Sequence, residues 1–377
     1  MKKAVNVLLF VFLSSSSFAQ ENSIATVNTE NTDLVIKRTL DLGVDKSKDS
    51  LFAIVPITKE LPAPNNNEIL TYEVDNLKPK EKIEVKHLID ISLDEKIIEG
   101  YNAPSHFFDL SDWSLSIPVD ADGNKKADNI EEKELSLGYI NDYFFATDAG
   151  AMVLTCPVGG VKTSANTKYT RVELREMLRR GDTSVKTKGV SENNWVLESS
   201  KSVKKAGGYN GELKATLEVN HVTTTGKSSQ VGRVIIGQIH AKNNEPVRLY
   251  YRKLPNNKKG SLYFAHETKG KGKGKGSEKY YEILGNRSDS AKDPKDGIAL
   301  NEKFTYKISL EGNKLSVSIH KPYGPVITKT IDIKKSGYNA ADEYMYFKAG
   351  VYNQNKTGNQ EDYVQATFYE LVNGHHD

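Results

Sequence analysis

The chain has 377 residues, of which 37% are hydrophobic and 27% charged, and its formal net charge is +3. These values are typical of a soluble globular protein with one large domain or two domains. Cys156 is the only cysteine, which excludes a fold held together by internal disulfides. Because Cys156 lies in an apolar stretch, we expect a small buried side chain and not a nucleophile.

Residues 1–19 predict an export signal. Lys2 and Lys3 precede an apolar run from Ala4 to Leu13, and Ser17-Phe18-Ala19 forms a small-x-small cleavage pattern. The apolar run is too short to span a bilayer, and no comparable run follows it. We therefore expect a protein without a membrane span that is secreted or periplasmic.

Charge divides the rest of the chain into two parts. Residues 20–102 hold 10 Lys and Arg against 16 Asp and Glu, whereas residues 103–377 hold 40 against 33. A basic domain outside the cell favours an anionic polysaccharide or lipid as partner before a nucleic acid, although solubility alone would also explain the charge. Residues 20–102 contain no chemical motif and are interpreted as an N-terminal extension or small accessory module, with a boundary at 102/103.

From residue 103 onward the sequence predicts an all-β fold. Short segments rich in Val, Ile, Tyr, Phe and Thr alternate with clusters of Gly, Asn, Asp and Lys, and none is typical of a long amphipathic helix. The segment 306–319 predicts a hairpin that turns at Gly312-Asn313. Many short strands without disulfides favour a jelly-roll β-sandwich of two antiparallel sheets.

Three of the predicted strands carry polar residues on one face. Side chains alternate along a strand with a period of two, so each of these strands has one apolar and one polar face. The polar residues are Arg171, Glu173 and Arg175 in the first strand, Gln238 and His240 in the second, and Lys348, Tyr352 and Gln354 in the third. Each set alone could be a charge ladder or a sheet-edge aromatic. Together they predict a sheet whose outer side is a polar groove.

The same segments carry a resemblance to a known family. YTRVELREM (169–177), GQIH (237–240) and YFKAGVYNQ (346–354), in this order and spacing, are similar to motifs of the alginate lyases of polysaccharide lyase family 7. FDLSDWSLSIPVD (108–120) resembles the start of the family's domain, so the resemblance covers residues 103–377. It implies a β-jelly roll whose concave sheet binds alginate, a linear polymer of mannuronate and guluronate. We expect a monomer.

The resemblance also implies the reaction, a β-elimination that removes the C5 proton of a uronate and expels the oxygen at C4. The enzyme must neutralise the carboxylate and supply a base and an acid. By motif, Arg171 and Gln238 would hold the carboxyl group, His240 would assist or serve as the base, and Tyr352 would protonate the leaving oxygen. A tyrosine normally titrates near about 10, and Lys348 or Arg171 would make its proton easier to share.

Further substrate contacts are expected from Glu173, Arg175, Lys348, Gln354, Arg248, Tyr250, Arg252 and His266. Glu173 and Arg175 would also orient Arg171. Gly350 would leave room for a sugar ring beside Tyr352, although a strand bulge would explain it equally well. No metal or other cofactor is expected, because no residue spacing is typical of metal ligands.

Two alternative functions stay open at this stage, since a fold does not decide a function. One is a non-catalytic module that binds acidic polysaccharide, and the other is a lyase for another uronate polymer such as glucuronan. Gln238, His240 and Tyr352 favour an enzyme, because binding needs cations and aromatic rings but neither a base nor an acid.

The loops bear on the mode of action. The insertion 272–297 would close one end of the groove and favours exolytic over endolytic release, and the basic run 269–276 would either wrap over a polyanion or form a solvated loop. The residues leave the preference between guluronate and mannuronate open. In the family, an isoleucine between Gln238 and His240 accompanies activity on guluronate-containing blocks.

Overall fold

The computed structural model of the chain describes residues 102–270 and 276–376 in full. The chain divides into two compact units, Met1–Lys96 and Ile97–Asp377. The first contains a six-stranded antiparallel sheet with the order β4-β3-β2-β1-β6-β5. Its strands are β1 (Leu8–Leu13), β2 (Glu21–Val27), β3 (Asp33–Arg38), β4 (Phe52–Pro56), β5 (Leu70–Tyr72) and β6 (Ile83–Val85). The predicted export signal and accessory module lie outside the residues described in full.

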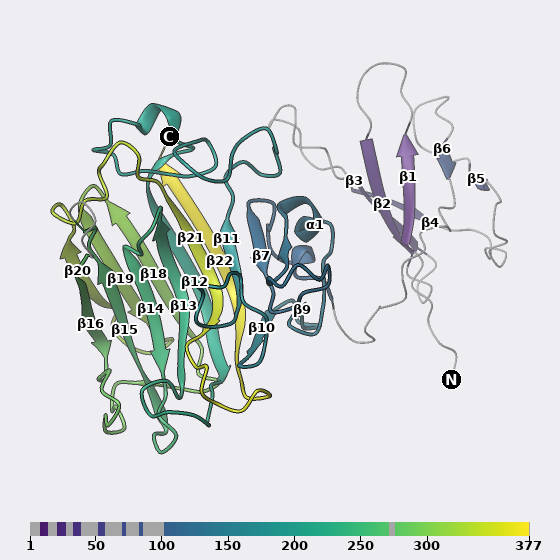
Figure 1. The fold of residues 1–377 in the computed structure, drawn as a ribbon. Coiled ribbons are helices and arrows are strands. Elements are labelled where there is room, and N and C mark those ends of the chain that lie inside the picture. Colours follow the sequence, from purple (N-terminus) through teal and green to yellow (C-terminus); the bar gives the residue numbers. More distant parts are fainter. Residues whose placement is uncertain are drawn as a thin grey trace. The chain divides into compact units, whose positions relative to one another are not determined.

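The second unit is a sandwich of two antiparallel sheets (Figure 1). The seven-stranded sheet has the order β20-β19-β18-β12-β22-β10-β9. Its strands are β9 (Phe144–Ala146), β10 (Met152–Pro157), β12 (Tyr209–His221), β18 (Phe304–Glu311), β19 (Lys314–His320), β20 (Ile327–Asp332) and β22 (Tyr363–His376). The predicted hairpin is confirmed, since β18 and β19 pair on either side of Gly312-Asn313.

The nine-stranded sheet has the order β16-β15-β14-β13-β21-β11-β7-β8, with β17 paired to β15. Its strands are β7 (Trp113–Ser116), β8 (Asn129–Ile130), β11 (Arg171–Glu176), β13 (Arg233–Ala241), β14 (Val247–Arg252), β15 (Lys259–Glu267), β16 (Glu278–Leu284), β17 (Ile298–Ala299) and β21 (Met345–Asn353). Helices are short: η1 (Pro104–His106), α1 (Glu132–Ser136) and η2 (Val203–Lys205). Among the residues described in full, no helix is long and apolar enough to cross a membrane.

The apolar faces of the strands meet in one core between the two sheets. Val172 and Leu174 of β11 and Phe347, Ala349 and Val351 of β21 all belong to it, and none is more than 1% exposed. Burying a large apolar side chain contributes roughly 1.5–3 kcal/mol, so a core of this size stabilises the sandwich without disulfides.

Cys156 of β10 lies in the same core and is fully buried. Burial raises the pKa of its thiol to about 12. The thiol therefore stays protonated and unreactive at neutral pH, as the apolar sequence around it predicts.

The three strands predicted to carry polar faces are neighbours in the nine-stranded sheet, in the order β13-β21-β11. Arg171 of β11 pairs with Tyr352 of β21, and Gln238 of β13 pairs with Lys348 of β21. Because paired residues point to the same side of a sheet, the three polar faces form one surface. This surface is the outer face of the nine-stranded sheet.

Gly350 is explained by an irregularity in the pairing of β21 with β13. Ile235 pairs with Tyr352 and Gly237 with Ala349, so β21 has one residue more than β13 between the two pairs. Gly350 has a φ of 138°, and an added Cβ would lie 2.5 Å from the carbonyl oxygen of Val172. The glycine is thus required inside the sheet, and room for a sugar ring is not its reason.

Candidate active site

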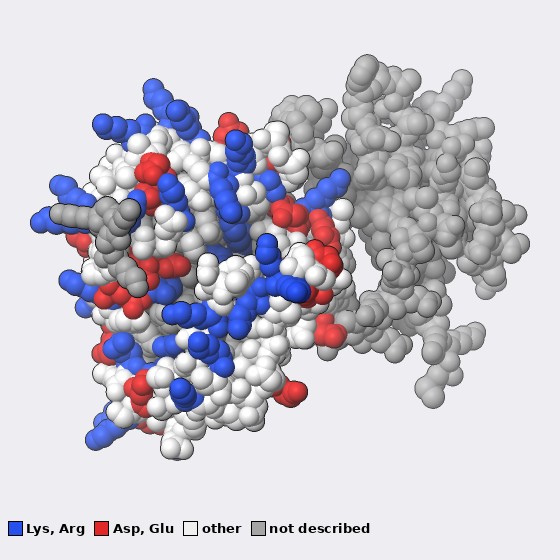
Figure 2. Space-filling model, viewed as in Figure 1, with Lys and Arg blue, Asp and Glu red and all other residues white. Residues whose placement is uncertain are grey.

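Two cavities lie on the outer face of the nine-stranded sheet and share Thr167, Arg171 and His240. The larger cavity has a volume of about 1030 Å³ and the smaller cavity about 500 Å³. Figure 2 shows a hollowed face along which Lys and Arg side chains gather. The cations that line the larger cavity are Arg171, Arg175, Lys188, Lys205, Lys242 and Lys348. A groove with this charge favours a polyanionic ligand.

Glu173 lies at the centre of the polar surface and is 2% exposed. Its carboxylate accepts a hydrogen bond from Nη1 of Arg171 at 2.9 Å, and further bonds from Nζ of Lys348 and Nε2 of Gln238. Burial alone would raise the pKa of Glu173, but the charges of Lys348 and Arg171 outweigh it and hold the pKa below its ordinary value. Glu173 therefore stays ionised and fixes three donors in one place.

Two of these donors keep capacity for a ligand. Burial and the nearby Arg171 charge lower the pKa of Lys348 to about 8, so its ammonium is still charged at neutral pH. Gln238 uses one N–H on Glu173, and an amide nitrogen carries two. Glu173 orients Arg171 as expected, and both of its carboxylate oxygens already accept hydrogen bonds from neighbouring side chains.

His240 is neutral. Its Nδ1 lies 2.5 Å from the carbonyl oxygen of Ala241, which can only accept, so Nδ1 carries the proton and Nε2 an unshared electron pair. Nε2 lies 3.4 Å from Oε1 of Glu245. Burial and the charge of Lys348 lower the pKa of His240 to about 3. A neutral imidazole with a free Nε2 is the form that can accept a proton.

Tyr352 is half-buried beneath a cation. The guanidinium carbon of Arg171 lies 3.8 Å from the centre of its ring, and Tyr169 packs edge-on at 6.3 Å. Burial raises the pKa of Tyr352, and the opposing effect of Arg171 is smaller. Arg171 thus acts on this proton in the expected direction, but burial outweighs its effect. The phenol keeps its proton at neutral pH, as a general acid must.

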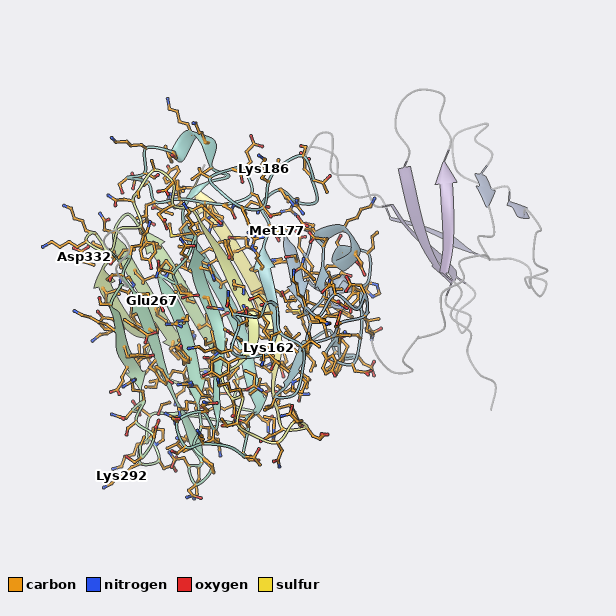
Figure 3. All side chains as sticks on the ribbon, in the orientation of Figure 1. Lys162, Met177, Lys186, Glu267, Lys292 and Asp332 are labelled. Atoms are coloured by element: carbon orange, nitrogen blue, oxygen red, sulfur yellow. The ribbon has the colours of Figure 1, made fainter. Side chains whose placement is uncertain are left out.

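The smaller cavity contains three of the expected substrate contacts, Arg248, Tyr250 and Gln354. Nη2 of Arg248 donates to Oε1 of Glu267 (labelled in Figure 3) at 2.7 Å, so part of the hydrogen-bonding capacity of the guanidinium is already used. Tyr250 is only 3% exposed because it stacks on Tyr263. Gln354 is buried, and its Nε2 has no hydrogen-bond partner among the described residues.

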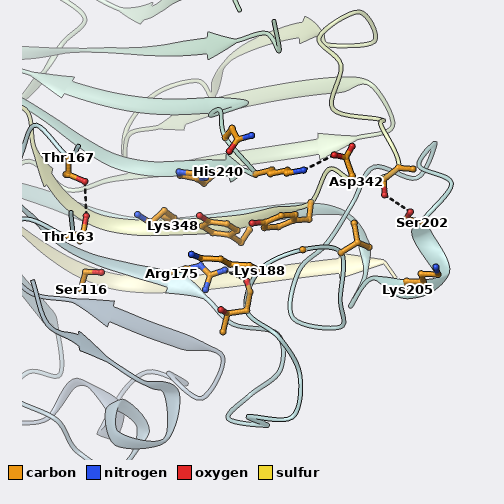
Figure 4. A pocket seen from close by; sticks show the side chains of 18 of the residues that line it. Ser116, Thr163, Thr167, Arg175, Lys188, Ser202, Lys205, His240, Asp342 and Lys348 are labelled. Carbon is orange, nitrogen blue, oxygen red and sulfur yellow. Dashed lines mark hydrogen bonds and ion pairs between the residues drawn. The ribbon is translucent and has the colours of Figure 1, made fainter. Parts of the chain in front are cut away.

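Arg175, which is labelled in Figure 4, and Tyr346 both line the larger cavity. The Tyr346 ring stacks on the His240 imidazole with centres 5.0 Å apart, and the guanidinium of Arg175 lies 4.2 Å from the same ring. Nη2 of Arg175 donates to the carbonyl oxygen of Thr187 at 2.7 Å. Arg175 thus supports Tyr346 and the loop at Thr187, and none of its recorded contacts reaches Arg171.

Arg252 and His266 lie outside both cavities, so the expected substrate contacts are not supported. Arg252 is 4% exposed and bonds to Asp289 at 2.8 Å. His266 is equally buried between the carbonyl oxygen of Pro246, 2.7 Å from Nδ1, and Oγ of Ser336, 2.8 Å from Nε2. Alternation predicts the face of a strand correctly, but it does not reveal which positions on that face are covered by loops.

The sequence analysis missed several residues of the groove. Tyr346 could have been found, because it shares its strand face with Lys348 and Tyr352. Tyr169 opens the first motif and Arg233 begins the strand of Gln238 and His240, so both could also have been found. The others come from neighbouring strands and from loops without a recognisable motif, and they are Lys168, Glu245, Glu278 and Tyr280.

A group of three carboxylates lies outside the two cavities. Oxygens of Asp120, Asp122 and Asp128 come within 4.8 Å of one another in a loop that lines neither cavity. Amide N–H groups of the same loop donate to them, as at Ala121, whose nitrogen is 3.0 Å from Oδ2 of Asp128. The cluster takes no part in the groove.

The family model described as alginate lyase matches residues 108–375. The chain belongs to the alginate lyases of polysaccharide lyase family 7. A similar relative is an alginate lyase of Klebsiella pneumoniae, 58% identical over 283 residues, which are 72% of this chain and 91% of the relative. The family resemblance predicted from three short motifs is thereby confirmed.

Solved structures of family members confirm the sandwich fold of this alginate lyase. A crystal structure of the alginate lyase from Klebsiella pneumoniae is 57% identical with a TM-score of 0.70, and covers 72% of this chain and 98% of that one. A crystal structure of an alginate lyase from Pseudomonas aeruginosa is 28% identical with a TM-score of 0.52, and covers 71% and 100%.

Proposed function

We propose that the protein depolymerises alginate by β-elimination at a uronate, giving unsaturated oligosaccharides or monouronates. One observation carries this proposal. A neutral His240 and a protonated Tyr352 lie on the same surface as the donors held by Glu173, within a cation-lined groove. A module that only binds polysaccharide needs neither a base such as His240 nor an acid such as Tyr352.

The carboxyl group of the reacting uronate would bind at Arg171 and Gln238. The C5 proton is weakly acidic because the neighbouring carboxylate is already negative, so further charge must be stabilised as the proton leaves. Donors that are already in place cost no reorganisation during the reaction, and removing one typically lowers kcat roughly 10²–10³-fold. The bonds to Glu173 supply this preorganisation.

The remaining two side chains would carry the protons. Nε2 of His240 takes the C5 proton, and the electrons of the C5–H bond form a double bond between C4 and C5. The bond between C4 and its oxygen breaks, and the phenol of Tyr352 gives its proton to that oxygen. The new double bond is conjugated with the carboxyl group, so the product absorbs ultraviolet light.

The test is the ultraviolet absorbance of purified protein with defined alginate blocks, without added metal and with a chelator present. A rise in absorbance supports the proposal. Binding without any rise would favour the polysaccharide-binding module, and a rise on glucuronan but not on alginate would favour the other uronate lyase.

We also propose that the enzyme releases short products exolytically. Contacts at one end of the larger cavity support this, since Nζ of Lys242 lies 2.8 Å from Oδ2 of Asp342 and Oγ of Ser202 donates to the carbonyl oxygen of Ala341 at 2.6 Å (Figure 4). The insertion 272–297 contains β16, which extends the sheet, and its Glu278 and Tyr280 line the smaller cavity. A rapid early fall in viscosity with a ladder of intermediate oligomers would contradict exolytic action.

The remaining proposals concern the state of the protein. We propose that residues 1–19 direct export to the periplasm or medium and are removed after Ala19, which N-terminal sequencing of the exported protein tests. We propose a monomer, which sedimentation tests, with alginate and not nucleic acid as its ligand.

A further inference from the structure

A carboxylate that belongs to none of the three motifs faces the proposed base. Glu245 lies in the loop between β13 and β14, and its Oε1 is 3.4 Å from Nε2 of His240. Both side chains line the smaller cavity and both are about three-quarters buried. Glu245 therefore lies next to the one nitrogen of His240 that is free to accept a proton.

A proton placed between the two groups would stabilise this contact. Nδ1 of His240 donates to Ala241, so Nε2 presents an electron pair to Glu245. An electron pair and an ionised carboxylate repel each other at this distance, and a single proton between them removes the repulsion. Burial raises the pKa of Glu245 to about 7, so at and below neutral pH the carboxyl group can hold that proton.

Charged groups on three neighbouring elements shift the pKa of Glu245. Arg248 of β14 and Lys348 of β21 lower its pKa, while Glu267 of β15 raises it. Glu267 raises it through its charge and through a side-chain hydrogen bond, and Glu267 itself pairs with Arg248 at 2.7 Å. Among the described residues, the recorded ion-pair partner of Glu245 is His240.

We propose that Glu245 is a positioning residue that acts through His240, so that the two side chains work as one base for the elimination. This rests on the proposed lyase activity. The C5 proton moves to Nε2 of His240 while the C5–H electrons form the C4–C5 double bond, and Tyr352 supplies the proton for the departing oxygen. The new Nε2–H then donates to the Glu245 carboxylate, which offsets the positive charge that the imidazole gains.

This offset matters because of the surrounding cations. Lys348 and Arg171 both oppose a positive charge on His240, as does its burial. Without a neighbouring anion, His240 would be a weak base. With Glu245 ionised, the proton moves into an environment that includes a negative charge, and the cost of forming the imidazolium falls.

The proposal predicts the sign of the pH dependence. Below a pH of about 7 the shared proton occupies the space between Glu245 and Nε2, and His240 cannot accept the substrate proton. Above a pH of about 7 this proton has left and Nε2 of His240 can accept the substrate proton, so kcat/KM should rise with pH through this region. Deprotonation of Lys348, with a pKa of about 8, would cause a separate decline at higher pH.

The decisive variant is Glu245→Gln, measured on alginate between acidic and alkaline pH. An amide cannot ionise, so the rising limb should disappear. At the wild-type optimum kcat should fall by about tenfold or more, up to the roughly 10²–10⁴-fold that a general base contributes, with little change in KM. Glu245→Asp keeps a titrating carboxyl group and should restore part of the rate and the limb.

Glu278→Gln is the matched control, because it removes a carboxylate from the same cavity whose recorded contacts do not include His240. It should keep the rising limb. A rising limb that persists in Glu245→Gln, or a rate lowered equally at every pH in a folded variant, would overturn the proposal. If the wild-type chain gives no ultraviolet product on any alginate block, the proposed function fails instead.

Discussion

The ammonium of Lys348 on β21 donates to Oε2 of Glu173 on β11, the same oxygen that accepts the hydrogen bond from Arg171. One buried carboxylate thus holds two cations of the groove against their mutual repulsion. Removing its charge leaves both cations without a counter-charge in a poorly solvated place, which is the costly way to break a buried ion pair.

Glu173→Gln should therefore destabilise the fold and abolish activity. Breaking a buried pair costs roughly 3–5 kcal/mol, which urea denaturation of the variant would measure. Glu370→Gln is the control, because its pair with Lys214 is solvent-exposed, with 38% and 43% of the two side chains accessible. Pairs of that kind are worth roughly 0–1 kcal/mol. Equal losses in the two variants would show that Glu173 is not the organising charge.

Tyr352→Phe tests the proposed acid. The substitution keeps the ring beneath Arg171 and deletes the proton, so kcat should fall by the roughly 10²–10⁴-fold typical of general acid catalysis, with little change in oligosaccharide affinity. Tyr346→Phe keeps the ring that stacks on His240 and should be mild. If the two variants behave alike, or if Tyr352→Phe weakens binding instead of the chemical step, the assignment of the acid is wrong.

The buried pair of His375 and Glu176 predicts how stability depends on pH. Nε2 of His375 lies 2.8 Å from Oε1 of Glu176, and Nδ1 lies 2.7 Å from the carbonyl oxygen of Asn210. Both partners only accept, so both ring nitrogens must donate and the imidazole is charged. Burial alone would lower the pKa of His375, but the Glu176 carboxylate outweighs it and raises the pKa.

Because the folded-state pKa of His375 lies above the unfolded value, its stabilisation is fully present below about pH 6.5. It is lost as the pH rises through the raised folded-state value. We expect the free energy of unfolding to fall over that range in the wild type and to fall less in His375→Gln. Urea denaturation at a series of pH values measures both, and parallel curves for the two proteins would refute the role of this pair.

Shortening the chain tests the N-terminal unit. Residues 20–102 carry the opposite net charge to the rest and contribute no residue to the described lining of the groove. A chain that begins at Asn102 keeps the bridge between Asn102 and Ala146. It should fold and retain turnover on short oligosaccharides, as measured by ultraviolet absorbance. Large loss of activity in a well-folded shortened chain would mean that the N-terminal unit completes the site.

Local alternation was enough to predict which side chains share a face. Arg171, Gln238 and Lys348 were placed correctly from the sequence, because successive side chains of a strand point to opposite sides whatever its neighbours are. The same reasoning predicted a sandwich stabilised by its core. Three motifs in order were sufficient to predict the family.

The tertiary structure decided how these faces combine. The order β13-β21-β11 depends on pairings between strands far apart in the chain, which no local pattern specifies. Burial raised the pKa of Tyr352 against the effect of Arg171. The fold also placed Glu245, from a loop without a recognisable motif, next to Nε2 of His240. A charge in a sequence carries no information on its solvation, which depends on what the folded chain packs around it.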